Sequence, residues 1–367
     1  MREFLAMVLV LCLIMGACCL LYIRADRPET LEAESIPTTG TSATSASTGT
    51  TGTTGTTGTT GTTGTTGTTG TTAPPFGVVA PTTSTTAPPD TSTTAPPATE
   101  LEPPVVLPLA ADYAFAYDHA TGEIVYAHGD LYAPCSPASI TKIFTVYVAL
   151  QILDPDTLVY VGSEINMIAT YSSVAKLSIG DVLTVEQLVA GSMLPSGNDA
   201  AYALAVAAGR ALSRSDGIPV QDALNLFMAQ VNSYAAQIGL VNTHLVTPDG
   251  NDAQGHYSCA YDILTMALLV YEDPIIRHYA SLESYSFTSP GGKKFSWKNS
   301  NLLLHSDSEY YIPEAVGLKT GSTTKAGNCL VSLFEVDGRL ICICVLGCDT
   351  TQQRYDDTLL LYNHITA

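Results

Sequence analysis

A low-complexity segment separates the part of this chain that can fold around a core from the part that cannot. Gly-Thr-Thr repeats from Gly49 to Gly70, and Thr, Ala, Pro and Ser dominate from there to Pro104. Glycine at every third position is also typical of collagen, but the repeat contains no proline. Such side chains bury too little apolar surface to offset the entropy lost on folding. We therefore expect residues 24–104 to be a disordered tether and residues 105–367 to form one domain with a full core.

Residues 5–23 are almost wholly apolar, and Arg2 and Arg24 flank them. About 19 helical residues span roughly 28 Å, close to the hydrocarbon thickness of a bilayer. A cleaved signal peptide usually has a shorter apolar stretch, and residues 15–18 resemble a bacterial lipobox only faintly. We therefore predict a transmembrane signal anchor, with residues 1–4 in the cytoplasm and the folded domain outside. A cleaved signal peptide or a lipid anchor is the alternative.

The formal net charge of −19 argues against binding to nucleic acid and against electrostatic adhesion to an anionic membrane. The folded domain has cysteines that permit disulfides or are simply buried thiols. They are Cys135, Cys259, Cys329, Cys342, Cys344 and Cys348. No Cys-His spacing typical of zinc occurs in the sequence, and the seven histidines are scattered. We therefore expect neither a metal nor a cofactor.

Three short motifs in the folded domain carry side chains typical of acyl transfer. They are Ser139-Ile140-Thr141-Lys142, Ser196-Gly197-Asn198 and Lys319-Thr320-Gly321. A serine hydroxyl is a weak nucleophile at neutral pH, and a lysine at i+3 on a helix faces the same side as the serine. Burial and a second cation, Lys319, are expected to lower the pKa of Lys142 so that it acts as a base. Ser196 can relay a proton and Asn198 can hold a substrate backbone, so the motifs predict an acyl-transfer site.

Hydrophobic periodicity predicts where these motifs lie in the fold. A hairpin is expected at Tyr113–Tyr117 and Ile124–Ala127, helices from Ile140 to about Gly239, strands at Val316–Leu318, Leu330–Val336 and Leu340–Leu346, and a last helix at about Gln353–Ile365. In this arrangement Ser139 begins a helix, and Lys319 ends a strand that turns at Gly327. The last helix should pack Leu359, Leu360 and Tyr362 against the sheet. The fold class is therefore α+β, with an antiparallel sheet flanked by helices, an all-helical lobe holding the Ser196 loop, and the site at their seam.

Further blocks of sequence accompany the three motifs. They are Pro137–Lys142, Leu194–Ala201, Thr247–Gly250 with Tyr257, Ser258 and Asp262 after it, Asn299–Leu303 and Gly317–Gly321. With these blocks the sequence from about Ala111 onward resembles the low-molecular-weight penicillin-binding proteins of the D-alanyl-D-alanine carboxypeptidase type, serine peptidase family S11. The resemblance implies a penicillin-binding/β-lactamase-like transpeptidase fold and a domain outside a bacterial cell membrane.

The resemblance also implies a role for each motif residue. Ser139 would be acylated by a peptidoglycan stem peptide ending in D-Ala-D-Ala and would release D-alanine, with Lys142 as general base. Ser196 and Lys319 would relay the proton, and Asn198 would position the substrate amide. The remaining substrate-binding residues would be Thr320, Gly321, Ser322 and Arg354, with the backbone N–H groups of Ser139 and Ser322 forming the oxyanion hole. Some members have arginine where this chain has Ser300, which leaves the details of carboxylate recognition open.

Other functions remain open from the sequence. β-Lactams mimic D-Ala-D-Ala and would acylate the same serine, so a class A β-lactamase of the same fold is an alternative. That enzyme type has Ser-Asp-Asn as its middle motif and a loop glutamate for rapid deacylation, neither of which is found here. We therefore expect slow release of a penicilloyl adduct. A D,D-endopeptidase and a non-hydrolytic penicillin- or peptidoglycan-binding module are the further alternatives.

Overall fold

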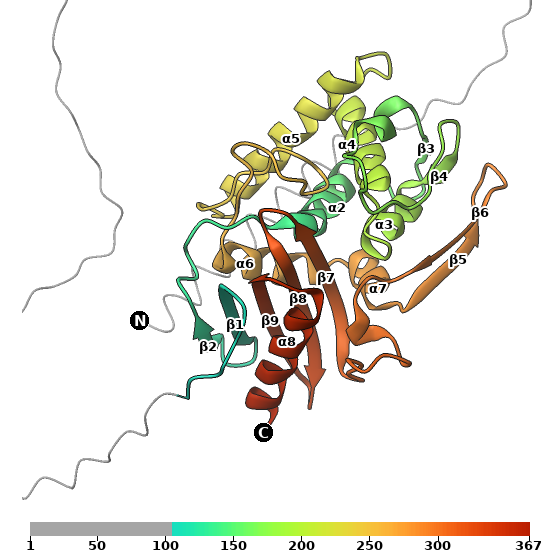
Figure 1. The fold of residues 1–367 in the computed structure, drawn as a ribbon. Helices are drawn as coiled ribbons and strands as arrows, with labels where there is room; N and C mark the ends of the chain where they lie inside the picture. Colours follow the sequence, from blue (N-terminus) through green and yellow to red (C-terminus); the bar gives the residue numbers. More distant parts are fainter. Residues whose placement is uncertain (1–104) are drawn as a thin grey trace, which may run out of the picture. The chain divides into compact units, whose positions relative to one another are not determined.

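A computed structural model describes residues 105–367, and these build a five-stranded antiparallel sheet with helices on both faces (Figure 1). The strand order is β2-β1-β9-β8-β7. The strands are β1 (Tyr113–Asp118), β2 (Glu123–His128), β7 (Ala315–Thr323), β8 (Gly327–Val336) and β9 (Arg339–Cys348). The predicted membrane span (5–23) and tether (24–104) lie outside the described residues.

Helices and short 3-10 turns connect or follow the strands of the sheet. They are η1 (Ala138–Ile140), α2 (Thr141–Ile152), η2 (Ser163–Met167), α3 (Val185–Met193), α4 (Asn198–Ser213), α5 (Val220–Gln237), α6 (Ala260–Tyr271), α7 (Pro274–Ser281), η3 (Leu302–Leu304) and α8 (Thr351–Thr366). Two hairpins complete the described residues: β3 (Leu158–Tyr160) with β4 (Val182–Thr184), and β5 (Ser284–Thr288) with β6 (Lys294–Lys298).

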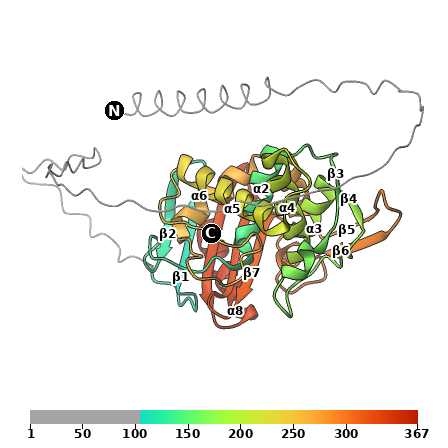
Figure 2. The ribbon, with the colours of Figure 1, turned by 90° about the horizontal axis from the view of Figure 1, so that it is seen from above.

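The sheet is buried on both faces, which explains the nearly continuous apolar sequence of β8 and β9. Side chains alternate between the faces of a strand. In β9 the odd-numbered residues from Ile341 to Val345 join the cluster that contains Tyr355 of α8. Cys342 and Cys344 join the larger cluster on the other face, with α2 and α6. Figure 2 shows the resulting layers, with α8 on one side of the sheet and α2 and α6 on the other.

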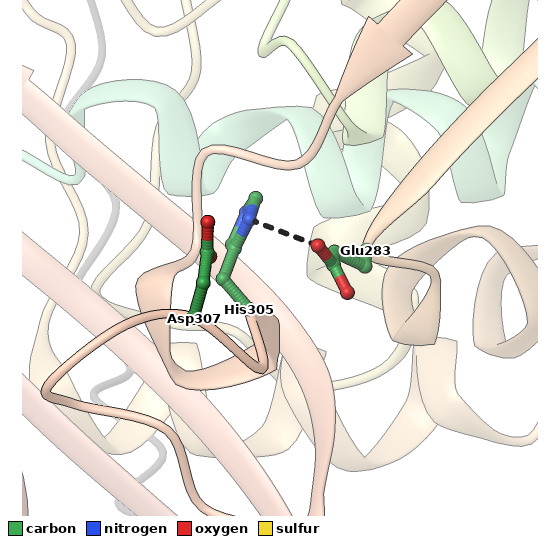
Figure 3. A group of neighbouring side chains, drawn as sticks. All are labelled: Glu283, His305 and Asp307. Atoms are coloured by element: carbon green, nitrogen blue, oxygen red, sulfur yellow. Dashed lines mark ion pairs between the residues drawn. The ribbon is translucent and has the colours of Figure 1, made fainter.

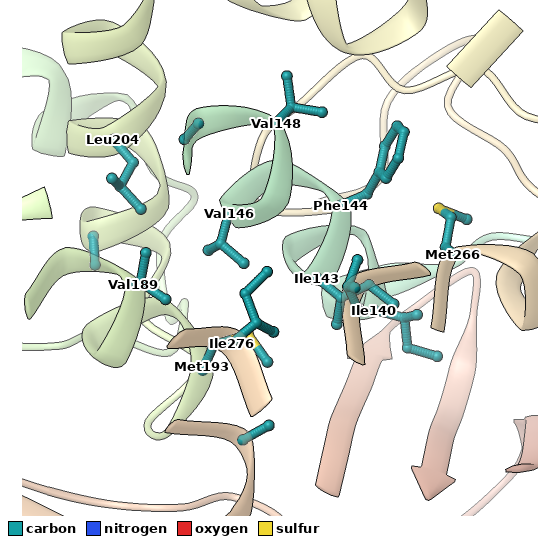
Figure 4. Packing of buried hydrophobic residues seen from close by; sticks show 14 of the residues in the cluster. Ile140, Ile143, Phe144, Val146, Val148, Val189, Met193, Leu204, Met266 and Ile276 are labelled. Carbon is teal, nitrogen blue, oxygen red and sulfur yellow. The ribbon is translucent and has the colours of Figure 1, made fainter. Parts of the chain in front are cut away.

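Helix α2 lies at the centre of the larger core, because its surface is apolar nearly all round. Ile143, Phe144, Val146 and Val148 of this helix are buried and point in different directions (Figure 4). They contact side chains from α3, α4, α6 and α7. The helix that follows the candidate nucleophile is therefore held firmly on several sides.

Most of the predicted elements are confirmed, and the differences follow from packing between distant segments. The lobe is not all helical, because it also contains the β3–β4 hairpin, and the β5–β6 hairpin was not predicted. The three late strands are longer than predicted. In α8 the prediction for Leu360 is wrong, because its side chain is exposed and Leu361 is the residue buried against the sheet.

The alternatives of disulfides and buried thiols concern cysteines of the described residues. No disulfide joins the cysteines of residues 105–367, all of which are free thiols and most of which are buried. Because the cysteines of the described residues are unpaired and most are buried, they contribute to packing as small apolar side chains. A separate finding is that the helices of residues 105–367 do not include one with the length and hydropathy of a membrane span.

Candidate active site

Ser139 lies in the short turn η1, directly before α2, at the wall of a cleft of about 280 Å³. The cleft lies between the helical lobe and β7, as the sequence predicts for the seam. Its lining is almost entirely polar and comes from Ser139, the segment 169–173, Asn198, the segment 249–252 and the segment 322–324. Ser139 therefore lies between the solvent-exposed cleft on one side and the buried core on the other.

The side chain of Lys142 points at Ser139, as the i+3 spacing predicts. Its Nζ donates to Ser139 Oγ at 2.8 Å and to the backbone carbonyl of Asp249 at 2.7 Å. The lysine is fully buried, and this burial lowers its pKa to about 8, although the carboxylates of Asp249 and Asp199 act in the opposite direction. A lysine with this pKa can accept a proton from a hydroxyl near neutral pH.

Lys319 is the second buried cation of the site, but it does not end its strand. It lies in the middle of β7, because pairing with β8 continues to Thr323. Burial lowers its pKa well below the ordinary value, and the nearby charges of Lys142 and Arg354 lower it further. The expected influence of one lysine on the other is thus found on Lys319, whereas burial is what lowers the pKa of Lys142. Its Nζ donates to the carbonyl of Thr320 at 3.0 Å.

The second motif lies on the opposite wall, where Asn198 begins α4. Ser196 has a φ of 58°, a left-handed backbone that an L-residue adopts only at some expense of energy. The backbone N–H of Asn198 donates to Ser173 at 2.8 Å, while its side-chain Oδ1 is buried without a partner. Within residues 105–367, no hydrogen bond joins the Ser196 hydroxyl to either lysine. This wall therefore presents polar groups that are not yet paired.

Two residues outside the predicted set hold the segment that closes this wall. Asp199 accepts hydrogen bonds from the N–H groups of Ala175 and Leu177 at 2.7 and 2.9 Å. Trp297 of β6 donates to the carbonyl of Ala175 at 2.8 Å. Asp199 was visible in the sequence beside Asn198, but its partners are about 22 to 24 residues away and could not be predicted.

The strand wall approaches Ser139 closely because of Gly321. A Cβ on this glycine would lie 2.9 Å from Ala138 Cβ and 3.0 Å from the backbone nitrogen of Ser139. Real Cβ atoms do not approach other atoms so closely without displacement. Glycine therefore allows β7 to bring Ser322 beside the nucleophile.

The predicted carboxylate-binding residues also belong to this wall. Thr320 Oγ1 and Ser300 Oγ are 2.7 Å apart, so the serine that replaces arginine in this block holds the threonine hydroxyl. Arg354 of α8 lies behind the strand. Its Nη1 donates to the carbonyl of Gly321 at 3.3 Å and to Ser322 Oγ at 3.1 Å, and its Nε has no partner. The structure thus brings Arg354 to the predicted site through its contacts with β7.

A second glycine-dependent approach involves the turn whose carbonyl accepts a hydrogen bond from Lys142. Gly250 has a φ of 82°, and a Cβ there would lie 1.8 Å from the carbonyl oxygen of Ala138. The preceding carbonyl of Asp249 is the second acceptor for Lys142 Nζ. The sequence Pro248-Asp249-Gly250 signals a turn, but its contact with the lysine is a long-range feature.

A group that could hold a metal ion lies among residues that do not line the cleft. Glu283, His305 and Asp307 place their ligand atoms within 4.8 Å of one another (Figure 3). The scattered histidines gave no indication of this group, because its members come from two segments joined only by the fold. In the described residues, no such group lies among the side chains that line the cleft.

Comparison with known proteins places this geometry in context. The family profile of D-alanyl-D-alanine carboxypeptidase, peptidase S11, matches residues 98–350. The D-alanyl-D-alanine carboxypeptidase DacD of Escherichia coli is 32% identical over 253 residues, which cover 65% of this chain and 59% of that protein. The D-alanyl-D-alanine carboxypeptidase of Streptomyces sp. strain K15 is 31% identical over 265 residues, which cover 70% of this chain and 87% of that protein.

A solved structure agrees with the sequence relatives. The crystal structure of the Streptomyces K15 DD-transpeptidase superposes with a TM-score of 0.63 at 31% identity, covering 71% of this chain and 98% of that one. The chain spans less than two thirds of the length of the E. coli relative. These similarities extend over the described domain and support the predicted penicillin-binding transpeptidase fold.

Proposed function

We propose that this chain, which belongs to the D-alanyl-D-alanine carboxypeptidase family, peptidase S11, is a serine-type carboxypeptidase that removes the terminal D-alanine from peptidoglycan stem peptides. The observation that carries the proposal is the 2.8 Å contact between Lys142 Nζ and Ser139 Oγ at a polar cleft. A buried lysine with a lowered pKa, bonded to a serine hydroxyl, is suited to nucleophilic catalysis.

In the proposed reaction, neutral Lys142 takes the proton from Ser139 as its oxygen attacks the carbonyl carbon of the penultimate D-alanine. The backbone N–H groups of Ser139 and Ser322 stabilise the oxyanion. Collapse of the tetrahedral intermediate breaks the C–N bond, and Ser196, with Lys319, relays the proton from Lys142 to the leaving amino group of D-alanine, which leaves Lys142 neutral again. Water then attacks the ester and gives a proton to Lys142, which passes it to the Ser139 oxygen as the ester C–O bond breaks, and the shortened peptide leaves with a new carboxylate.

Substrate recognition is divided between the two walls. The unpaired Oδ1 of Asn198 is available to accept the N–H of the substrate backbone. On the strand wall, Thr320 receives the terminal carboxylate, and Lys319 and Arg354 supply positive potential beside it. Since Arg354 donates to Gly321 and Ser322, its charge acts through the strand that carries the binding groups.

β-Lactams should acylate Ser139 and leave slowly. In the described residues that line the cleft there is no glutamate, and the carboxylates present are those of Asp249 and Asp252. Asp252 is occupied by hydrogen bonds from Ser136, Thr323 and the N–H of Lys325. Asp249 accepts the N–H of Asn251 through Oδ1, and its Oδ2 is buried without a partner. Because the described lining of the cleft lacks the glutamate that activates water at the penicilloyl ester of class A β-lactamases, rapid β-lactamase turnover is disfavoured.

We also propose that the domain acts outside the cytoplasmic membrane of a bacterial cell. The apolar run at residues 5–23 supports a single-pass anchor, and the composition of residues 24–104 supports a flexible tether between membrane and enzyme. This location agrees with the chemistry, because the proposed substrate is a component of the cell wall.

The proposed activity is tested by measuring D-alanine released from a peptide ending in Lys-D-Ala-D-Ala. The full-length chain is used in a mild detergent, beside Ser139→Ala and a penicillin-treated sample. A peptide ending in Lys-D-Ala-L-Ala serves as a stereochemical control. We expect release from the D,D-peptide alone, lost in both controls. Absence of release by the folded wild-type chain, or equal release by Ser139→Ala, would contradict the proposal.

A further inference from the structure

The group formed by Glu283, His305 and Asp307 joins two segments of the chain (Figure 3), and none of its members lines the proposed catalytic cleft. Glu283 lies between α7 and β5, and the other two residues follow η3. The segments are already adjacent, because the N–H of Asn299 donates to the carbonyl of Glu283 at 2.8 Å. The two carboxylates are exposed, whereas His305 is 5% exposed.

The imidazole of His305 is oriented by its surroundings. Its Nε2 is 2.6 Å from the backbone carbonyl oxygen of Asn299, which can only accept a hydrogen bond. Nε2 therefore donates a hydrogen to this carbonyl, and Nδ1 is the ring nitrogen that faces Glu283 and is left to bind a metal ion. Histidine ligands to metals are held in this way, with the second ring nitrogen donating to a carbonyl or carboxylate.

The distance between His305 and Glu283 is informative. Nδ1 and the nearer carboxylate oxygen are 3.7 Å apart. A charge-assisted hydrogen bond would bring these atoms to roughly 2.8 Å, whereas two ligands on a tetrahedral Zn²⁺ are separated by roughly 3.4 Å. The observed separation is therefore closer to that of two ligands around a cation than to that of a hydrogen-bonded pair.

The third member makes the arrangement a potential metal site. All three ligand atoms lie within 4.8 Å of one another, and the exposed side chains of Glu283 and Asp307 need to move by only about 1 Å to close on one ion. One nitrogen and two carboxylate oxygens are a ligand set suited to zinc, with a solvent molecule in the fourth position. An adjoining hollow, lined in part by His305 and Asp307, gives an ion access from solvent.

We propose that Glu283, His305 and Asp307 bind a divalent transition metal ion of the Zn²⁺ type. The ion links the start of β5 to the segment after η3, and so stabilises the folded chain whenever it is bound. It lies outside the cleft and takes no part in the proposed acyl transfer.

Zinc binding is measured by equilibrium dialysis and metal analysis of the full-length chain, which carries no histidine tag and has been treated with a chelator. We expect about one Zn²⁺ per chain and a higher melting temperature when Zn²⁺ is present. Asp307→Asn, Glu283→Gln and His305→Gln should each weaken binding by about tenfold or more. Asp307→Asn is the decisive variant, because the side chain of Asp307 is exposed and the fold of the variant protein should be unchanged.

Glu309→Gln is the matched control, since it removes a negative charge two residues from Asp307 without removing a proposed ligand. We expect its zinc affinity to stay within about twofold of wild type, given the small effect of one exposed charge. Absence of stoichiometric zinc binding by the wild type would overturn the proposal. So would equal binding by wild type and all three ligand variants, because the zinc would then be held elsewhere, for example by thiols.

Discussion

The two walls of the cleft are built differently. On the strand wall, Thr320 is already paired with Ser300 and Ser322 with Arg354, and an unpaired atom there is Nε of Arg354, behind the strand. On the helical wall, Asn198 Oδ1 is buried without a partner, and Ser196 adopts a left-handed backbone. Unpaired buried polar groups are energetically unfavourable, and they are common at functional sites.

This difference indicates a division of labour. The strand wall fixes the position of positive charge and of the oxyanion-binding N–H groups before substrate arrives, which is the condition for electrostatic catalysis. The helical wall instead offers groups that become paired only when a peptide binds. Changes on the strand wall should therefore impair acylation of every substrate, whereas changes on the helical wall should depend on the substrate's backbone.

Replacement of the base between the two walls should have the largest effect. Lys142→Met keeps the length of the side chain but removes the proton acceptor, so acylation should fall by about a thousandfold. The melting temperature should not decrease by more than a few degrees, because burial disfavours the charge that is removed. Stopped-flow acylation by a fluorescent penicillin measures the acylation rate, and a thermal melt measures the melting temperature. Acylation within tenfold of wild type would show that another group is the base.

A change in the strand wall should have the next largest effect. Gly321→Ala places a methyl group against Ala138 and the backbone of Ser139, which displaces β7 from the nucleophile. We expect acylation by penicillin and by peptide to fall together by about a hundredfold, as when an oxyanion-hole donor is lost. Gly217→Ala is the matched control, because the nearest atom to its Cβ is 3.9 Å away. Equal rates for the two variants would refute a fixed strand wall.

The effect of a change in the helical wall should be smaller and should depend on the ligand. Asn198→Ala removes a buried oxygen that has no partner in the free protein, so the free energy of unfolding should not decrease. Peptide turnover should fall by about thirtyfold, the equivalent of a hydrogen bond of roughly 2 kcal/mol. The value of kcat/KM for the peptide measures the effect on turnover, and chemical denaturation measures the effect on the free energy of unfolding. A loss of stability without a loss of kcat/KM would assign this residue to the fold alone.

The smallest predicted effect is the pH dependence of acylation. Burial lowers the pKa of Lys142 to about 8, and the neutral form is the base. The neutral fraction, and therefore kcat/KM, should rise about tenfold between pH 7 and pH 9. The rate of acylation by penicillin across this range provides the measurement. A flat or falling profile would show that neutral Lys142 does not limit the reaction.

The sequence predicted those features that depend on local spacing or on strong apolar patterns. The i+3 relation of Ser139 and Lys142 follows from helix geometry, and the strands β8 and β9 follow from their apolar runs. The antiparallel sheet and the position of the cleft could therefore be predicted correctly.

Features that depend on contacts between distant segments could not be predicted. Lys319 lies in mid-strand because β7 and β8 pair beyond Thr320, and the sequence of β7 there is too polar to indicate a strand. The acceptor carbonyl of Asp249 is 107 residues from Lys142. Leu360 was assigned to the wrong face because Leu359, Leu360 and Leu361 are consecutive, and only the packing of α8 on the sheet decides which of them are buried.

The central claim is that Ser139 forms a covalent acyl-enzyme with Lys142 as its base. Intact-mass measurement of the full-length chain after brief exposure to benzylpenicillin, followed by peptide mapping, tests it most directly. The account predicts one added penicillin mass on the peptide that contains Ser139, slow to disappear, absent from Ser139→Ala and formed far more slowly by Lys142→Met. An adduct on a different residue, or equal labelling of Ser139→Ala, would contradict it.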